Sequence, residues 1–548
     1  MSKIKIFSLG GLNEDGKNMY VVKVDSDIFI FDAGLKYAND NLLGVDYVIP
    51  NFDYLKENIK NIKGLFITHG HEKNMGAVCD IVSEIPDIKV YVTRFSANIL
   101  RRDLEESNIK FNNLIEIDPY RKISFGKNSI FPVRLTHSIP DNVGYALNTE
   151  DGTIFYTGNY VFDATMLGSY KADIGKLAYI GKQGVLCLLG ESMYADKIGY
   201  TSPKNRIDKL IRDTLNKTDN RIIVTVFTAH VSRIEELFNE IKKTTRRVVV
   251  MGHKLQSIIN NMIDNNYIKF DKDRIGDLSN IDDKDAVILI SNEREKPFMN
   301  LNRIINGYDR YIKLKENDTV FFMEPINDYN EALAIKVIDD ISKTGVSVVT
   351  MSRKDNLLHH ASSEDIMLML DLMEPKYYVP VSGEYRHMVA NAKCASHVGM
   401  KSENIILKQN GDVITFVNGI LKENFEKVKV DDILIDGNSS QDVGELVLKD
   451  RELLSDNGIV IICSTLDKRS KAILAYPEVL TRGFIYVKES SDLIEEMKRI
   501  SLEVINENTS DNYVEYNKIK MGIRERLSNY LYEETGCKPM IITVIQEV

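Results

Sequence analysis

Two histidines separated by one residue are the part of this chain with the clearest capacity for chemistry. His69 and His71 follow an apolar run, 62–67, that is expected to form a strand, and they precede an apolar-periodic stretch, 75–85, that is expected to form a helix. Imidazole is a common zinc ligand, and a loop at a strand end can direct both rings to one point. The alternative is two exposed or hydrogen-bonded histidines on an ordinary loop, and the spacing alone leaves both open.

The length and composition limit the kind of protein that carries this pair. With 548 residues the chain is too long for one hydrophobic core, so two or three domains are expected. The 70 basic and 80 acidic residues give a net charge of −10, which argues against a protein that coats nucleic acids but is compatible with a local basic groove.

The cysteines and the apolar runs indicate the compartment. The 5 cysteines are odd in number and contain no Cys-x-x-Cys pair, which favours free thiols in a reducing cytoplasm over disulfides or a zinc knuckle. Residues 1–11 lack a signal core, and no stretch approaches the roughly 18 apolar residues of a membrane span. We therefore expect a cytoplasmic protein without a membrane partner.

The elements that must position the histidines change in character along the chain. Residues 1–200 are rich in predicted strands, and most polar loops follow strand ends. From about 205 to 351, strands and helices alternate, which predicts a parallel sheet covered by helices. A further helix and strand occupy 363–381, and a linker rich in Gly, Asp and Ser at 431–444 precedes a final αβ segment.

Short motifs spread through the chain carry a family resemblance. They are Phe31-Asp32-Ala33-Gly34, Gly44-Val45-Asp46, Thr136-His137-Ser138-Ile139-Pro140-Asp141, Thr157-Gly158, His360-Ala361-Ser362, Gly383-Glu384-Tyr385-Arg386, Asp436-Gly437, Asp442-Val443-Gly444 and Arg482-Gly483-Phe484. By these motifs the chain resembles ribonuclease J, a metallo-β-lactamase nuclease with an inserted β-CASP domain. Within that family it resembles the catalytically degenerate second paralogue. Members degrade RNA from a 5′-monophosphate end and also cut internally.

The resemblance implies the fold class and its division along the chain. The fold is expected to be α/β, a metallo-β-lactamase αββα sandwich with an inserted β-CASP parallel-sheet domain and a small α+β C-terminal domain. The parts are a first metallo-β-lactamase segment at 1–203, the β-CASP domain at 204–352, a second metallo-β-lactamase segment at 353–430, a linker at 431–447 and the C-terminal domain at 448–548.

The family binds two zinc ions, and the matching positions differ between the two sites. The first site retains His69, His71 and His137. The changed positions of the second site are Lys73 for an Asp, Asn74 for a His, Ser382 for a distal His and Asn159 for the bridging Asp. Because the second site has lost its ligands, we expect at most one zinc per chain and no second metal. Phosphodiester hydrolysis gains from two metals, so weak or absent activity is expected. Lys73 either places an ammonium group at the second site or is a solvated lysine.

Further positions of the resemblance concern the substrate and another metal. The expected phosphate-binding segment is Asn356, Leu357, Leu358, His359 and His360. His360 is retained in the family pattern, and its alternative role is a histidine that merely enters the following helix. Charged residues at 291–297 replace glycines, so capture of a monophosphate end is expected to be weak. Asp46 and Asp436 match the carboxylates of a calcium site found in some members.

Three functions remain open. The favoured one is a ribonuclease J-like protein of RNA processing and decay that acts as partner subunit of an intact ribonuclease J paralogue, or of a second copy of itself. The second is a weak single-zinc nuclease in which Glu72 or Asp141 helps to orient water. The third is an RNA-binding scaffold without a nuclease partner.

Overall fold

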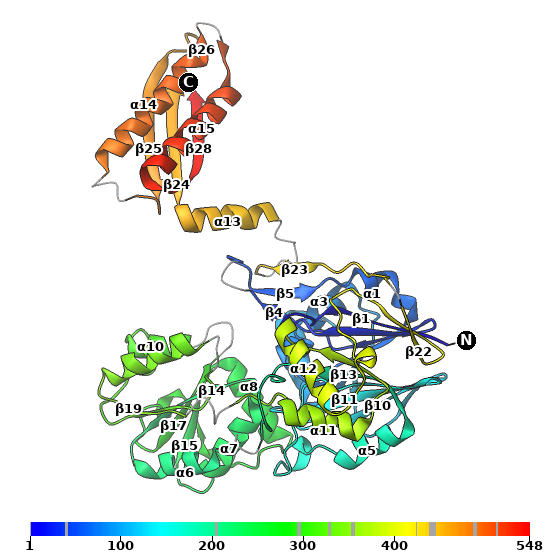
Figure 1. The fold of residues 1–548 in the computed structure, drawn as a ribbon. Coiled ribbons are helices and arrows are strands. Elements are labelled where there is room, and N and C mark those ends of the chain that lie inside the picture. The colour runs from blue at the N-terminus through cyan, green and yellow to red at the C-terminus, as the bar shows by residue number, and fades with distance from the viewer. Residues whose placement is uncertain are drawn as a thin grey trace. The chain divides into compact units, whose positions relative to one another are not determined.

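Two β-sheets lie face to face in the computed structural model, which describes residues 2–38, 42–202, 207–292, 298–326, 330–351, 357–423, 425–437, 445–485, 490–510 and 513–548 (Figure 1). The first sheet contains, in spatial order, β22 (Ile420–Lys422), β21 (Ile414–Val417), β1 (Lys3–Gly10), β2 (Met19–Val24), β3 (Asp27–Phe31), β6 (Ile62–Phe66), β7 (Val90–Thr93) and β8 (Leu114–Ile117). The second contains β20 (Tyr377–Val381), β13 (Val185–Glu191), β12 (Gly152–Tyr156), β11 (Val143–Thr149), β10 (Asn128–Arg134) and β9 (Ile123–Phe125).

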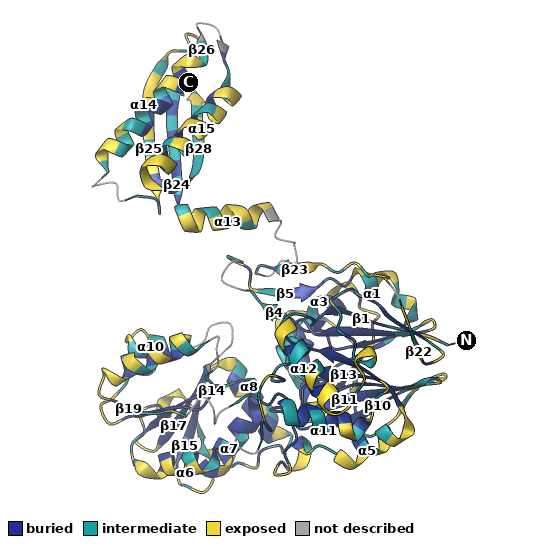
Figure 2. Cartoon of the chain, in the orientation of Figure 1, coloured by how far each residue is buried: buried dark blue, intermediate teal, exposed yellow. Residues whose placement is uncertain are grey.

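The central strands of both sheets are buried because each sheet is covered on both faces (Figure 2). Between the sheets, the rings of Phe31 and Phe66 contact the ring of Tyr145 at centroid distances of 5.8 and 5.7 Å. The helices on the outer faces are α1 (Asp53–Glu57) and α4 (Arg94–Glu106) on the first sheet, and α5 (Ile174–Gln183), α11 (Ser363–Met373) and α12 (Tyr385–His397) on the second. This order of layers confirms the expected αββα sandwich.

A third sheet is parallel throughout. Its strands, in spatial order, are β16 (Ile275–Gly276), β15 (Arg247–Met251), β17 (Ala286–Asn292), β14 (Ile222–Phe227), β18 (Thr319–Phe322) and β19 (Ser347–Val349). Its helices are α6 (Asp208–Lys217), α7 (Val231–Ile241), α8 (His253–Asp264), α9 (Met299–Ile305) and α10 (Glu331–Ser342). Val224 packs in one apolar cluster with Leu237, whereas its neighbour Ile223 packs in another with Leu301, so both faces are filled. The parallel sheet predicted from the alternation is confirmed.

The C-terminal part belongs to a separate compact unit, Ala38–Tyr47 with Leu434–Val548; the other unit is Met1–Tyr37 with Val48–Ile433. The elements of the C-terminal part are α13 (Glu445–Asn457), β24 (Ile459–Leu466), β25 (Ile473–Arg482), α14 (Ser491–Glu507), β26 (Thr509–Ser510), β27 (Tyr513–Val514), α15 (Tyr516–Thr535) and β28 (Met540–Glu547). Elsewhere, β4 (Lys36–Tyr37), β5 (Tyr47–Pro50) and β23 (Asp432–Ile435) are short strands. Within the described residues, we find no helix with the length and apolar character that crossing a membrane requires. The domain limits given above remain predictions.

The segment around the histidine pair differs in one respect from expectation. The strand predicted at 62–67 is β6, but the single helix predicted at 75–85 is wrong. Two short helices, α2 (Glu72–Met75) and α3 (Val78–Glu84), replace it. The break follows from tertiary contacts: the amide of Ala77 donates to Ala33 O at 2.9 Å, and Gly76 lies so close to Leu35 that an added Cβ would meet that side chain at 2.5 Å.

Candidate metal centre

The three predicted zinc ligands meet beside the ends of two strands from different sheets. His69 and His71 follow β6, and His137 follows β10. The hydroxyl of Tyr145 donates to Ile67 O at 2.7 Å, which ties the loop after β6 to the second sheet. The sandwich therefore brings together residues that lie far apart in the sequence.

The geometry of the three rings fits one metal ion. His71 Nδ1 lies 3.0 Å from His69 Nε2 and 3.1 Å from His137 Nε2. All three ligand nitrogens fall within 4.8 Å of one another. Zinc–nitrogen bonds of about 2.1 Å at tetrahedral angles place ligand nitrogens about 3.4 Å apart, so small adjustments suffice. Among the described residues, this is the one cluster of at least three His, Cys, Asp or Glu side chains with such spacing.

The second nitrogen of each ring is bound to an acceptor. The three hydrogen bonds are His69 Nδ1 to Thr68 Oγ1 at 2.9 Å, His71 Nε2 to Ala229 O at 2.6 Å and His137 Nδ1 to His359 O at 2.7 Å. Thr68 Oγ1 is free to accept because it donates its own proton to Asp32. These bonds leave the converging nitrogens unprotonated, as outer-shell partners do in metal sites.

Burial supports the same protonation state. It lowers the pKa of His69 and His137 well below the ordinary value and that of His71 to about 4. The rings are therefore neutral at physiological pH, and each presents a lone pair. The donor set and its outer acceptors both fit a zinc ion.

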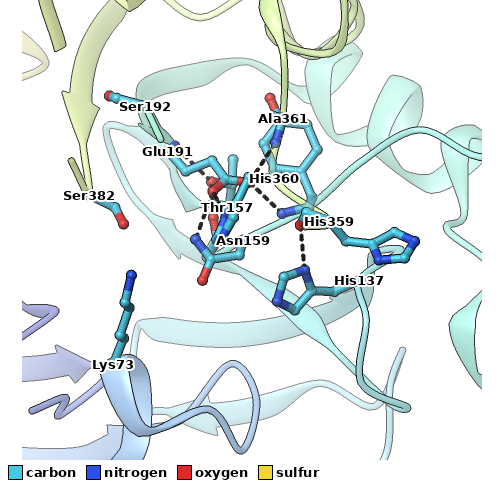
Figure 3. A network of polar contacts seen from close by, with 12 residues as sticks. Lys73, His137, Thr157, Asn159, Glu191, Ser192, His359, His360, Ala361 and Ser382 are labelled. Atoms are coloured by element: carbon cyan, nitrogen blue, oxygen red, sulfur yellow. Dashed lines mark hydrogen bonds and ion pairs between the residues drawn. The ribbon is translucent and has the colours of Figure 1, made fainter. Parts of the chain in front are cut away.

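The four changed positions of the second site are bound to other protein groups. Their partners are Asp15 for the Lys73 ammonium, Asp32 Oδ2 for Asn74 Nδ2 at 2.7 Å, Glu191 Oε2 for Asn159 Nδ2 at 2.7 Å, and Gly11 O for the backbone amide of Ser382 at 3.0 Å. Figure 3 shows the Lys73 side chain extending toward Ser382. None of the four side chains is an imidazole, thiolate or carboxylate, the groups that usually bind zinc.

Asp32 organises the loop from within the core. Its carboxylate is fully buried and accepts hydrogen bonds from Thr68 N, Asn74 Nδ2 and Tyr156 OH, each at 2.7 Å. Burial raises the pKa of Asp32 to about 6. Asn74 Oδ1 is buried without a hydrogen-bond partner among the described residues. The amide group therefore donates to Asp32 through its nitrogen while its oxygen stays unpaired, which is energetically unfavourable.

Glu191 is a buried residue of the site that the sequence reading missed. Its carboxylate accepts from Asn159 Nδ2, from the amide of Tyr160 at 2.6 Å, from His360 Nδ1 at 2.9 Å and from the amide of Ala361 at 3.2 Å (Figure 3). The bond to His360 turns Nε2 of that ring away from Glu191. A charged residue at the end of the apolar run 185–190 was the signal that could have identified it.

The predicted phosphate-binding segment is partly accounted for. Asn356 lies outside the described residues, while Leu357 and Leu358 are half-buried. His359 is buried, and its Nδ1 lies 2.9 Å from His230 Nε2. Residues 293–297 of the charged loop are also outside the described residues, and the substrate roles remain predictions.

The two residues matched to a calcium site have protein partners. Asp46 accepts a hydrogen bond from the amide of Gly437 at 2.8 Å, and Asp436 forms an ion pair with Arg451 at 2.6 Å. The guanidinium also donates to Leu43 O at 3.0 Å. Arg451 thus supplies positive charge to one of the two carboxylates.

Three family models match the chain. They are "Ribonuclease J, beta-CASP domain" at residues 219–341, "Zn-dependent metallo-hydrolase RNA specificity domain" at 353–407 and "Ribonuclease J C-terminal domain" at 446–548. Zinc is consistent with the second description and with the histidine triad.

Curated relatives match along the whole chain. The "Ribonuclease J2" of Bacillus subtilis (strain 168) is 36% identical, with 100% of this chain and 99% of that protein covered. The "Ribonuclease J 2" of Staphylococcus aureus (strain MRSA252) is 34% identical over 100% and 98%. A crystal structure of a protein of unknown function from Enterococcus faecalis V583 shares the fold at a TM-score of 0.53 and 14% identity, covering 76% of this chain and 100% of that one. The chain belongs to the ribonuclease J family.

Proposed function

We propose that this protein has lost most or all of its own nuclease activity and acts in RNA processing as the partner subunit of an active ribonuclease J. The observation that carries the proposal is the state of the second metal site, where the amide of Asn159 is bound to Glu191 and the ammonium group of Lys73 to Asp15. Two metals with a bridging carboxylate stabilise the charge of phosphodiester hydrolysis. An amide and an ammonium group supply no such bridge.

RNA is the expected ligand of the chain. The match to an RNA specificity domain and the names of the curated relatives support this assignment. A monophosphate end is expected to be held poorly, because charged residues at 291–297 stand where the family has glycines. The protein would then guide RNA without trimming it.

The C-terminal sheet offers a surface for a partner subunit. Helices α14 and α15 pack on one face, over Val460 and Ile462. On the strands, Leu480, Ile542 and Val544 are 52%, 41% and 47% exposed. Ile461 is the register partner of both Leu480 and Ile542, so these side chains form one apolar row. Such a row favours burial against another chain, and a homologous chain is a natural occupant because related subunits present related surfaces.

A weak single-zinc nuclease is the second candidate. The intact triad and the orientation of His360 by Glu191 favour it. A zinc held by His69, His71 and His137 would supply positive charge that polarises a phosphoryl oxygen. Glu72 and Asp141 are poor candidates for orienting water, because Glu72 is paired with Lys254 at 2.6 Å and Asp141 accepts from the Tyr267 hydroxyl.

Co-expression with an active ribonuclease J tests the partner proposal. We expect the two chains to co-elute in sizing at micromolar concentration, and the mixed assembly to cleave RNA through the active chain. Leu480→Glu with Val544→Glu is expected to reduce co-elution, whereas Lys468→Glu on the adjoining turn serves as a charge control. Separate elution together with an unchanged cleavage pattern of the active chain would rule out the partner role.

A further inference from the structure

Two of the zinc ligands are oriented by backbone carbonyls that lie far away in the sequence. His71 donates to Ala229 O, 158 residues later, and His137 donates to His359 O, 222 residues later. Ala229 lies between β14 and α7 of the β-CASP segment, and His359 lies before α11 of the hydrolase. The metal centre is therefore completed by groups from two other segments.

A hydrogen bond between the imidazoles of His230 and His359 joins these two segments. His230 Nε2 lies 2.9 Å from His359 Nδ1, and the ring planes are nearly perpendicular at 86° with centroids 4.9 Å apart. Both side chains are buried, at 1% and 4% exposure. His359 therefore offers its carbonyl to a zinc ligand and its ring to the residue that follows Ala229.

A further contact holds the β-CASP loop against the third ligand. Ser138 Oγ donates to Ala229 O at 3.2 Å, and the amide of Ser232 donates to Ser138 O at 2.8 Å. Ala229 O thus accepts from the ring of one ligand and from the neighbour of another. A shift of the loop that contains Ala229 would therefore weaken the alignment of both His71 and His137.

We propose that His230 and His359 are positioning residues of the metal centre, and that their hydrogen bond couples zinc binding to the docking of the β-CASP segment on the hydrolase. With the pair in place, the two carbonyls hold the rings of His71 and His137 in the orientation that a metal requires. Figure 3 shows the bond from His137 to His359. Coupling of this kind is reciprocal, so bound zinc stabilises the docked segment. The inference applies whether or not hydrolysis is retained.

The full-length chain allows a direct test without relying on activity. Zinc affinity, measured by competition with a chromophoric chelator, is expected to fall about 10- to 100-fold in His230→Ala, in the range of outer-shell substitutions. His230→Gln, whose side-chain amide extends about as far as the imidazole Nε2 and retains a donor for His359 Nδ1, is expected to recover most of the affinity. His387→Ala is the matched control, because His387 is also a buried histidine with an unpartnered Nδ1 among the described residues but orients no zinc ligand.

Amide hydrogen exchange supplies a readout in the unaltered protein. Added zinc is expected to slow exchange at residues 228–234 as well as around the ligands, and this protection should be lost in His230→Ala. The proposal is overturned if the unaltered chain binds no zinc at micromolar concentration, if zinc protects the ligand loops but not 228–234, or if His230→Ala and His387→Ala lower the affinity equally. If His230→Ala does not fold, His359→Ala tests the same bond, because it retains the carbonyl and removes only the ring.

Discussion

Lys73 forms an ion pair with Asp15, and both side chains are largely buried, at 16% and 12% exposure. The protein therefore places a cation together with its counter-ion at a position where the family places a metal ligand. The ammonium group has no lone pair to offer a divalent cation, and it occupies the carboxylate of Asp15.

The metal content of the purified chain follows from this arrangement. We expect at most one zinc per chain, and less in His71→Ala, because that variant removes the nitrogen that lies closest to both other ligands. Elemental analysis after purification without chelators measures both values. Two ions per chain would contradict the expectation.

Asn159→Asp is expected to destabilise the chain by about 1–3 kcal/mol, because a carboxylate replaces a donor that lies 2.7 Å from Glu191. The decrease in the free energy of unfolding should be greater at pH 8 than at pH 5, because low pH allows one of the two carboxyl groups to keep a proton. Urea unfolding at both pH values gives the comparison. Equal midpoints for the variant and the unaltered chain would show that the two groups do not interact.

Restoring the second site is expected not to restore full activity. Lys73→Asp, Asn74→His, Asn159→Asp and Ser382→His together should raise metal content, but the charged loop at 292–296 would still position phosphate poorly. An error of about 1 Å in position costs around 100-fold in rate. The measurement compares the rate at which the variant and an active ribonuclease J degrade 5′-monophosphorylated RNA. Equal rates would contradict the prediction.

Residual nuclease activity is expected to lie about 1000-fold or more below that of an active family member, because losing a metal removes several kcal/mol of charge stabilisation. His137→Ala should abolish whatever remains. Activity that survives in this variant comes from a contaminating nuclease. A rate within tenfold of the active enzyme would contradict the prediction.

Asp365 gives the stability of the fold a pH dependence. Its buried carboxylate accepts from the amides of Phe162 and Thr201, and burial raises the pKa to about 6. Because this value exceeds the unfolded value of about 3.9, the folded state binds the proton more tightly, and stability falls as the pH rises from about 4 to about 6. Asp365→Asn cannot titrate, so the stability advantage of the unaltered chain should shrink by about 2 kcal/mol across this range. Urea unfolding at pH 4.5 and 7 measures it; a constant difference would refute the assignment.

The cluster of three histidines could be predicted from sequence because its residue types and spacing are distinctive. His69 and His71 lie on one loop, and the family pattern supplied His137. The new partners could not be predicted in the same way. Asp15 was not identified, and the position of Glu191 at the end of an apolar run indicates a buried charge but not that it reaches Asn159 across the fold. The break at Gly76 was missed for a similar reason, because it depends on contacts with Ala33 and Leu35.

The separation between the zinc ligands and their carbonyl acceptors has a consequence for synthesis of the chain. His69, His71 and His137 leave the ribosome early, but His137 meets its acceptor only after residue 359 has been made. Contacts over such separations form slowly because long loops must close first. The nascent chain therefore carries an unfinished set of imidazoles while the β-CASP segment is translated, and zinc is expected to be retained firmly only late in biogenesis.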